Sequence, residues 1–236
     1  MTPSPAARRL VLIAVLAALV AALAPAAAGA HPMDERNAAF VRSIDGFAFW
    51  PFLYLGAKHM VTGYDHLLFL VGVIFFLYRL RDVVLYVSLF TVGHSITLLF
   101  GVLWGLNVNA YVIDAIIGLS VAYKAFENMG GFERLIGFRP NTRAAVLVFG
   151  LFHGLGLATK LQEFTVSENG LVANILSFNA GVEVGQILAL SAVLIAFLYW
   201  RTRPSFEQHA FLTNSALMSG GFLLAGYQLV GYVLFS

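Results

Sequence analysis

The chain has 236 residues, of which 60% are hydrophobic and only 11% are charged, and its formal net charge is +2. A soluble domain usually carries about 25% charged residues, so the composition argues against a water-soluble fold. The net charge is small and the basic residues are scattered along the chain, which argues against a nucleic-acid-binding surface. The absence of cysteine excludes disulfides and thiolate ligands, so a bound metal ion would need His, carboxylate, Met or backbone ligands.

Residues 1–30 are predicted to form a cleaved signal peptide. Arg8 and Arg9 precede an apolar run at 10–23, and the segment ends in the small residues 28–30. A retained first helix is the alternative, but Pro25 and the polar stretch at 34–37 favour cleavage. His31 would then be the mature N-terminus, where its amine and imidazole can chelate a metal, although any residue can follow a cleavage site.

Six apolar segments in the rest of the chain are each near the roughly 20 residues that cross a membrane. Residues 31–62 are predicted to be an outer-side segment whose aromatic stretch, 47–55, is too short to span and forms an interfacial or re-entrant helix. Residues 63–236 form the transmembrane domain, with spans near 63–80, 82–104, 109–129, 142–159, 174–200 and 211–235. The sequence therefore predicts an all-α membrane protein, a bundle of about six transmembrane helices in contact with lipid.

The distribution of basic residues predicts the orientation of this bundle. If the mature N-terminus lies outside, eight basic residues fall on the inner side and four on the outer side. This bias agrees with the positive-inside rule and with the signal peptide. We therefore expect a multi-pass protein of the bacterial inner membrane with its N-terminus on the periplasmic side.

Glycine pairs in three of the predicted spans indicate where helices approach closely. Two glycines four residues apart lie on one helix face and let a neighbouring backbone come near. The pairs are Gly101/Gly105, Gly150/Gly154 and Gly181/Gly185.

Ionisable residues inside the predicted spans are costly in a membrane and need a partner or a role. With alternating helix directions, they fall at similar depths between the outer boundary and the midplane. Asn179, Glu183 and Gln186 share one face of their helix. His59 and His66 align if the helix continues through Gly63, although this glycine can also mark a break. The ionisable residues of this set are Asp65, His66, His94, Asp114, His153 and Glu183.

The chemistry that suits this set is binding of a divalent transition metal, because imidazole binds nickel, cobalt, zinc and copper, and carboxylates orient the imidazole. Each residue also has a simpler explanation. Asp65 and His66 can cap a helix at the membrane surface. His94 and His153 can be satisfied by Ser or backbone groups, and Asp114 can pair with Lys58 or a backbone amide. Glu183 is harder to explain without a role.

Four motifs together resemble the HupE/UreJ family of hydrogenase and urease accessory membrane proteins, which are regarded as nickel permeases. The motifs are HMVTGYDH at 59–66, GHSITL at 93–98, FHG at 152–154 and FNAGVEVGQ at 178–186. The resemblance implies a six-helix permease with a cleaved signal peptide, and it implies roles in metal passage for His59, Asp65, His66 and His153.

The chain departs from the nickel-permease branch after the FHG motif. That branch continues to an acidic residue, but Gly156, Ala158 and Lys160 occupy the three later defined positions, so Glu183 is expected to supply the carboxylate instead. The pattern is closer to a second branch of the family. The metal is therefore left open, with nickel the first candidate and copper, cobalt and zinc the others.

The leading hypothesis is a secondary permease that imports a divalent metal, because the chain has no P-loop for ATP. The site would comprise His59, Asp65, His66, His94, His153 and Glu183, with His31, Asp114, Asn179 and Gln186 as additional candidates. The alternatives are an accessory or scaffold protein that binds copper or nickel without moving it, and an intramembrane metalloprotein. No catalytic residue is predicted, and self-association and a link to metalloenzyme maturation stay open.

Overall fold

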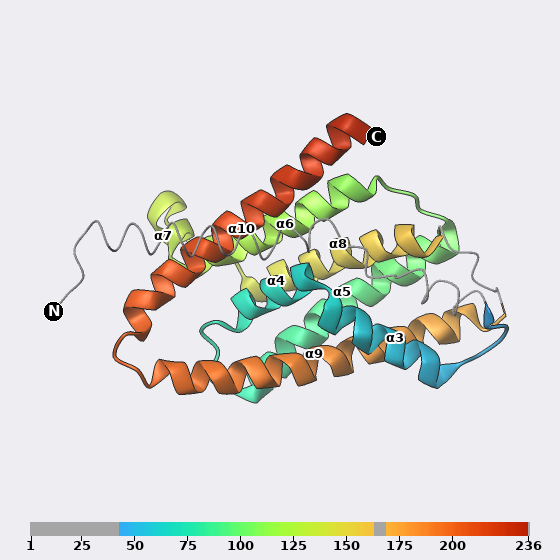
Figure 1. Cartoon of the computed structure of the whole chain (residues 1–236), viewed down its shortest axis with the longest axis horizontal. Helices are drawn as coiled ribbons and strands as arrows, with labels where there is room; N and C mark the ends of the chain where they lie inside the picture. Colours follow the sequence, from blue (N-terminus) through green and yellow to red (C-terminus); the bar gives the residue numbers. More distant parts are fainter. Residues whose placement is uncertain (1–42, 163–168, 236) are drawn as a thin grey trace.

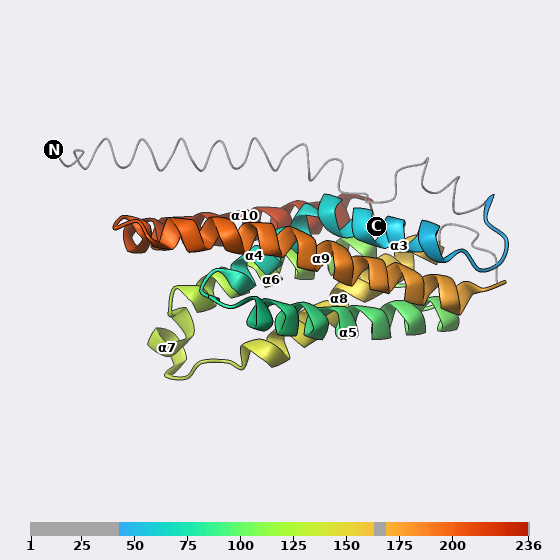
Figure 2. The same ribbon diagram turned by 90° about the horizontal axis from the view of Figure 1, so that it is seen from below.

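The computed structural model describes residues 43–162 and 169–235, and within these ranges the chain forms helices and no strand. The long helices run roughly along one axis, and the short helix α7 lies at one end of the molecule (Figures 1 and 2). The all-α prediction is confirmed, whereas the predicted signal peptide and His31 lie outside the described residues. The helices are α3 (Phe49–Thr62), α4 (Tyr64–Ile74), α5 (Leu80–Trp104), α6 (Ala110–Asn128), α7 (Gly131–Ile136), α8 (Thr142–Gln162), α9 (Leu171–Arg201) and α10 (Phe206–Phe235).

Four helices of the described ranges, α5, α8, α9 and α10, are long and apolar enough to cross a membrane. Each lies where a span was predicted. Helix α6 also lies at a predicted span and has 19 residues, but it carries Asp114, Lys124 and Glu127. These charges are paired: Lys124 Nζ lies 2.9 Å from Glu127, and Lys160 Nζ lies 3.2 Å from Asp114. Pairing lowers the cost of placing charged groups in a membrane interior.

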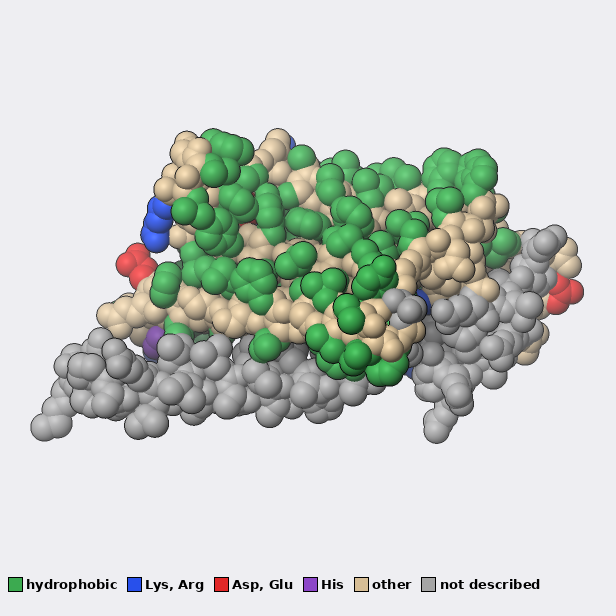
Figure 3. Space-filling view, turned by 90° about the horizontal axis from the view of Figure 1, so that it is seen from above, with side chains coloured by type: hydrophobic (Ala, Val, Ile, Leu, Met, Phe, Trp, Pro, Cys, Tyr) green, Lys and Arg blue, Asp and Glu red, His purple; other side chains and the backbone are tan. Residues whose placement is uncertain are grey.

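The outer surface of the bundle is strongly apolar. Large hydrophobic side chains are exposed along every long helix, including Leu188, Ile195 and Val233, which are 67%, 69% and 79% exposed. Figure 3 shows hydrophobic side chains spread across the described part of the face in view. A water-soluble monomer rarely exposes such extensive apolar surface. The surface therefore agrees with the predicted contact with lipid.

The first predicted span is wrong in its bounds, because α4 ends at Ile74 and does not reach residue 80. The Arg201 guanidinium, at the end of α9, donates to the carbonyl oxygens of Ile74, Phe75 and Leu77. The last carbonyl groups of a helix have no partner within the helix. Arg201 donates to these carbonyl groups, of which that of Ile74 also accepts from the Leu77 amide, and thereby stabilises the end of α4 at this point.

The short aromatic helix predicted at 47–55 is also longer than expected, since α3 continues to Thr62 and packs along α9 (Figure 2). Gly63 separates α3 from α4 with an extended backbone. A Cβ atom at Gly63 would lie 2.9 Å from His66 Nδ1 and 3.0 Å from the His59 carbonyl oxygen. A larger residue would crowd both atoms where these two histidine-bearing helices meet.

Close backbone contacts through glycine hold the long helices in pairs. In the pair of α5 and α8, a Cβ atom on Gly150 would overlap the Phe90 carbonyl oxygen, and one on Gly154 would overlap that of His94. Gly181 meets the backbone of Leu53 in the same way, where α9 packs on α3. The predicted close contacts at 150/154 and 181/185 are confirmed, whereas Gly105 has a different role and ends α5 in a left-handed conformation.

Candidate functional site

Four histidines from four helices meet inside the bundle. His59 lies near the end of α3, His66 in the first turn of α4, His94 in α5 and His153 in α8. Each is at most 5% exposed. The His66 ring lies 5.0 Å from the His59 ring and 4.5 Å from the His153 ring, measured between centroids. The structure therefore brings these four histidines into one group.

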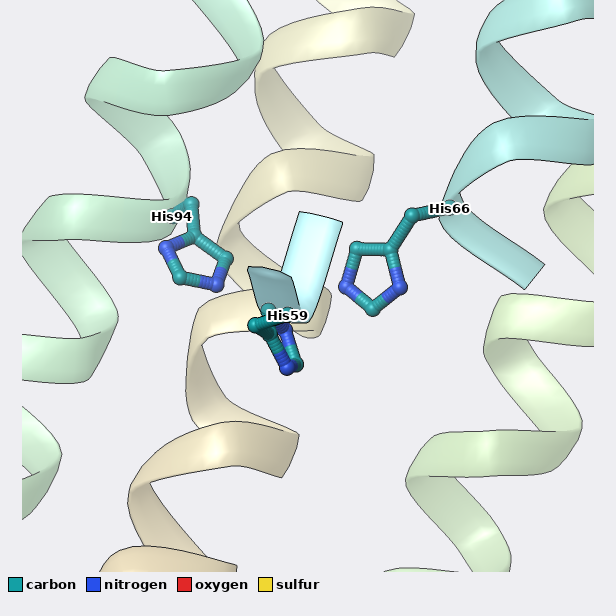
Figure 4. A group of neighbouring side chains, drawn as sticks. All are labelled: His59, His66 and His94. Carbon is teal, nitrogen blue, oxygen red and sulfur yellow. The ribbon is translucent and has the colours of Figure 1, made fainter. Parts of the chain in front are cut away.

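The side chains of His59, His66 and His94 point toward a common centre (Figure 4). One donor atom from each of these three residues lies within 4.8 Å of the others. Three nitrogens that bind one ion at about 2.0–2.1 Å and are spread evenly around it are about 3.6 Å apart. A movement of each nitrogen by about 1 Å or less toward the common centre would therefore bring all three to binding distance of a single ion.

Hydrogen bonds fix the orientation of three of the four rings through the Nδ1 atom. His66 Nδ1 donates to Asp65 Oδ1 at 2.8 Å, and His94 Nδ1 donates to Asn179 Oδ1 at 3.0 Å. His153 Nδ1 donates to the Phe149 carbonyl oxygen at 2.7 Å. An acceptor opposite Nδ1 places the proton there and leaves the Nε2 lone pair free. This is the arrangement in which a neutral imidazole binds a metal through Nε2.

The opposite ring atoms have no partner. In the part of the chain that the structure describes, the Nε2 atoms of His66, His94 and His153 are buried and accept no hydrogen bond, and both nitrogens of His59 are in the same state. A buried polar atom without a partner costs about 1–3 kcal/mol. Five such atoms in one group are unusual in a folded protein. A transition metal ion would satisfy them, so these residues fit a metal.

The simpler explanations offered for these residues hold only in part. Asp65 does accept from the backbone amide of His66, at 2.9 Å, as a helix cap would. The same carboxylate oxygen accepts from the His66 ring. The backbone partner of His153 satisfies Nδ1 and leaves Nε2 free. Capping and backbone contacts therefore account for the Nδ1 atoms of these histidines and leave the Nε2 atoms, which could bind a metal, unexplained.

A small cavity of about 20 Å³ adjoins the histidines. A volume of about 10–15 Å³ on this measure holds one water molecule, so the cavity has room for one ion without its hydration shell. Charged groups line it together with three of the histidines. Its lining residues are His59, Asp65, His66, Asp114, Ile117, His153, Gly156, Leu157 and Lys160.

Asp114 pairs with Lys160, whereas the sequence suggested Lys58 or a backbone amide as its partner. Lys160 Nζ, near the end of α8, lies 3.2 Å and 3.3 Å from the two carboxylate oxygens of Asp114. From the sequence, Lys160 was noted as a basic residue of the outer side and as a departure from a motif, but not as part of the site. The signal was a basic residue predicted close to the outer end of a span, opposite an acidic residue of another span.

Glu183 lies outside the histidine group. Its carboxylate accepts from Ser88 Oγ at 2.8 Å, and it is not among the residues with mutually close donor atoms. Gln186 is buried, where it accepts from Thr91 Oγ1 at 3.1 Å and contacts Met60 Sδ at 3.2 Å. The carboxylate next to the histidines is that of Asp65, so Glu183 does not take the place that the sequence assigned to it.

Comparison with known proteins places these features in a family. The family model described as HupE / UreJ protein matches residues 35–236. Searches of curated proteins and of solved structures found no match. The matched region includes every described helix and all four buried histidines. This chain therefore belongs to the HupE/UreJ family.

Proposed function

We propose that the protein is a secondary permease that carries a divalent transition metal ion, with nickel the first candidate, into the cytoplasm. The observation that carries this proposal is the group of four buried histidines, three of which have Nδ1 held by an acceptor while Nε2 has no partner. The family's association with nickel handling supports the choice of nickel. The metal is the cargo of the protein, and the histidines are its transient ligands.

The donor set favours a borderline metal. Imidazole nitrogen suits nickel, cobalt, zinc and copper, whereas magnesium and calcium prefer oxygen ligands. The chain has no cysteine that could give a thiolate site of very high affinity. Neutral imidazoles with one nearby carboxylate would bind a divalent ion and still allow its release.

The proposed transport path would be open to one side at a time. Aromatic side chains of α4 and α5 pack against His153: its ring lies 6.0 Å from the Phe69 ring and 4.8 Å from the Phe90 ring. Phe69 follows His66 by one turn of α4 and packs against Phe149. These rings would separate the site from the end of the bundle where α4 ends. Release on that side would require α4 to move relative to α5 and α8.

The proposed topology has six spans. The bent pair α3 and α4 forms the first, and α5, α6, α8, α9 and α10 form the others. The basic side chains near the end of α9, Arg201 and Arg203, would then face the cytoplasm, as the positive-inside rule requires. The mature N-terminus would lie outside the inner membrane, so metal would reach the histidines from the periplasm.

Uptake into proteoliposomes tests this function. Purified protein would be reconstituted, and accumulation of nickel, cobalt, copper and zinc would be measured separately. The protein is expected to accumulate at least one of these ions, and His153→Ala is expected to reduce uptake more than ten-fold. His209→Ala is the matched control, because His209 is an exposed histidine in the first turns of α10.

Three outcomes would count against the proposal. Metal binding without accumulation would favour an accessory protein that holds the metal. Tight, stoichiometric metal after purification would favour an intramembrane metalloprotein. Equal uptake by the wild type and His153→Ala would contradict the assignment of the site.

A further inference from the structure

A positive side chain lines the same cavity as the histidines. Lys160 pairs with Asp114, and their side chains are 17% and 13% exposed. Both residues line the cavity with His59, Asp65 and His66. A cationic group next to a proposed cation site needs an explanation, because it repels the ion that the histidines would bind.

The ion pair lies toward one end of the bundle. Asp114 is five residues into α6 by position, and Lys160 is two residues before the end of α8. The beginning of α6 and the end of α8 lie at the same end of the molecule (Figure 1). The pair therefore lies between the cavity and this end of the bundle, which the proposed topology places on the outer side.

The ion pair also sets the charge of the site. With neutral imidazoles, the cavity lining contains two carboxylates, Asp65 and Asp114, and one ammonium group, Lys160. The net charge is then minus one. A divalent ion would leave an excess positive charge while Lys160 stays in place. The two carboxylates would fully compensate the two positive charges of the ion if the ammonium group moved away from Asp114.

We propose that Lys160 is a tethered counter-cation of the metal site, which competes with the incoming metal for the Asp114 carboxylate and limits how tightly a divalent ion is held. This inference rests on the proposed function, because it concerns the affinity of the same site. Displacement of Lys160 accompanies metal entry from the outer side. Its return to Asp114 favours release of the ion from the histidines.

Substitutions that remove one charge at a time should change affinity in opposite directions. Lys160→Met leaves Asp114 free for the metal, so Ni²⁺ should bind about ten-fold tighter or more. Asp114→Asn leaves an unpaired ammonium group, so Ni²⁺ should bind about ten-fold more weakly or worse. Lys160→Arg keeps the charge and should stay close to the wild type. A purely structural ion pair would weaken binding in both single variants.

Equilibrium binding of Ni²⁺ to the full chain in nanodiscs gives the readout, with Ag⁺ as a monovalent probe. The logarithm of the change in affinity should be about twice as large for Ni²⁺ as for Ag⁺, because the interaction is proportional to the charge of the ion. Arg143→Met is the matched control. It removes an exposed positive charge at the beginning of α8, at the opposite end of the same helix from Lys160.

The double variant Asp114→Asn/Lys160→Met covers the case in which Lys160→Met fails to fold. It leaves no unpaired charge and should bind Ni²⁺ about ten-fold tighter or more than Asp114→Asn. Equal affinities of these two variants, or weaker binding by a folded Lys160→Met, would overturn the inference. If the wild type binds and transports Ni²⁺, such a result leaves the proposed function intact. Absence of metal binding by the wild type would instead contradict the proposed function itself.

Discussion

Asp65→Asn separates the charge of the carboxylate from its role as a hydrogen-bond acceptor. The carboxylate accepts from the ring and the backbone amide of His66, at 2.8 and 2.9 Å. The asparagine side-chain oxygen can accept both hydrogen bonds and keep the ring in place. The substitution therefore removes one negative charge from the site and changes little else.

The size of the effect follows from the distance between this charge and the metal. A metal on His66 Nε2 would lie about 6–7 Å from the carboxylate, given the 2.8 Å hydrogen bond, the width of the ring and a bond of about 2 Å. At an effective dielectric constant of about 20, a divalent ion would lose about 5 kcal/mol of attraction, which is an upper limit. Loss of a carboxylate behind a ligand histidine typically costs about ten- to hundred-fold in affinity. We expect a loss of at least about ten-fold.

The assay is competition of the reconstituted protein with a chelating dye for Ni²⁺ or Co²⁺. Asp82→Asn is the control, because Asp82 lies in the first turn of α5, far along this helix from His94. The account predicts weaker binding by Asp65→Asn and no change in the control. A change of less than about two-fold in Asp65→Asn would refute the argument that this carboxylate supports metal binding through His66.

Three further predictions follow from the packing and chemistry of the site. Gly154→Ala would push a methyl group against the His94 carbonyl oxygen, so it should lower the free energy of unfolding by about 1–3 kcal/mol and weaken metal binding. Gly226→Ala is the control, because a Cβ atom there would meet no atom within 4 Å. This control should change neither thermal unfolding nor metal titration. Arg201→Met removes a guanidinium that donates to three carbonyl groups at and just after the end of α4. It should lower the unfolding temperature more than Arg203→Met, which removes a guanidinium that contacts Tyr199 one turn away on the surface, and equal melting curves would contradict this. Metal affinity should fall as the pH is lowered, because protons compete with the metal for Nε2, and an affinity that does not change with pH would contradict binding by histidines.

The sequence predicted the long helices well because length and apolar composition determine them locally. The segments at 82–104, 109–129 and 142–159 correspond to α5, α6 and α8 within a few residues. The first span was predicted poorly because its end depends on a distant residue. Arg201 is more than 120 positions away along the chain, and it meets α4 only in the folded bundle.

His66, His94 and His153 could be singled out from the sequence because ionisable residues are rare in apolar segments and their depths could be compared, whereas the role of His59 was implied only by the family resemblance. Rotation about the helix axes could not be derived in the same way. Asn179 reaches His94, but Glu183, one turn further along α9, reaches Ser88 instead. The role of Lys160 was also hidden, since a contact between α6 and α8 depends on how the two helices pack.

X-ray absorption at the metal edge of the loaded protein tests the central claim most directly. The account predicts a first shell that contains at least three imidazole nitrogens at about 2.0–2.1 Å, with fewer imidazoles in His59→Ala and an unchanged spectrum in His209→Ala. A shell made only of oxygen atoms, or an identical imidazole signal in His59→Ala, would contradict the assignment of the buried histidines as the metal site.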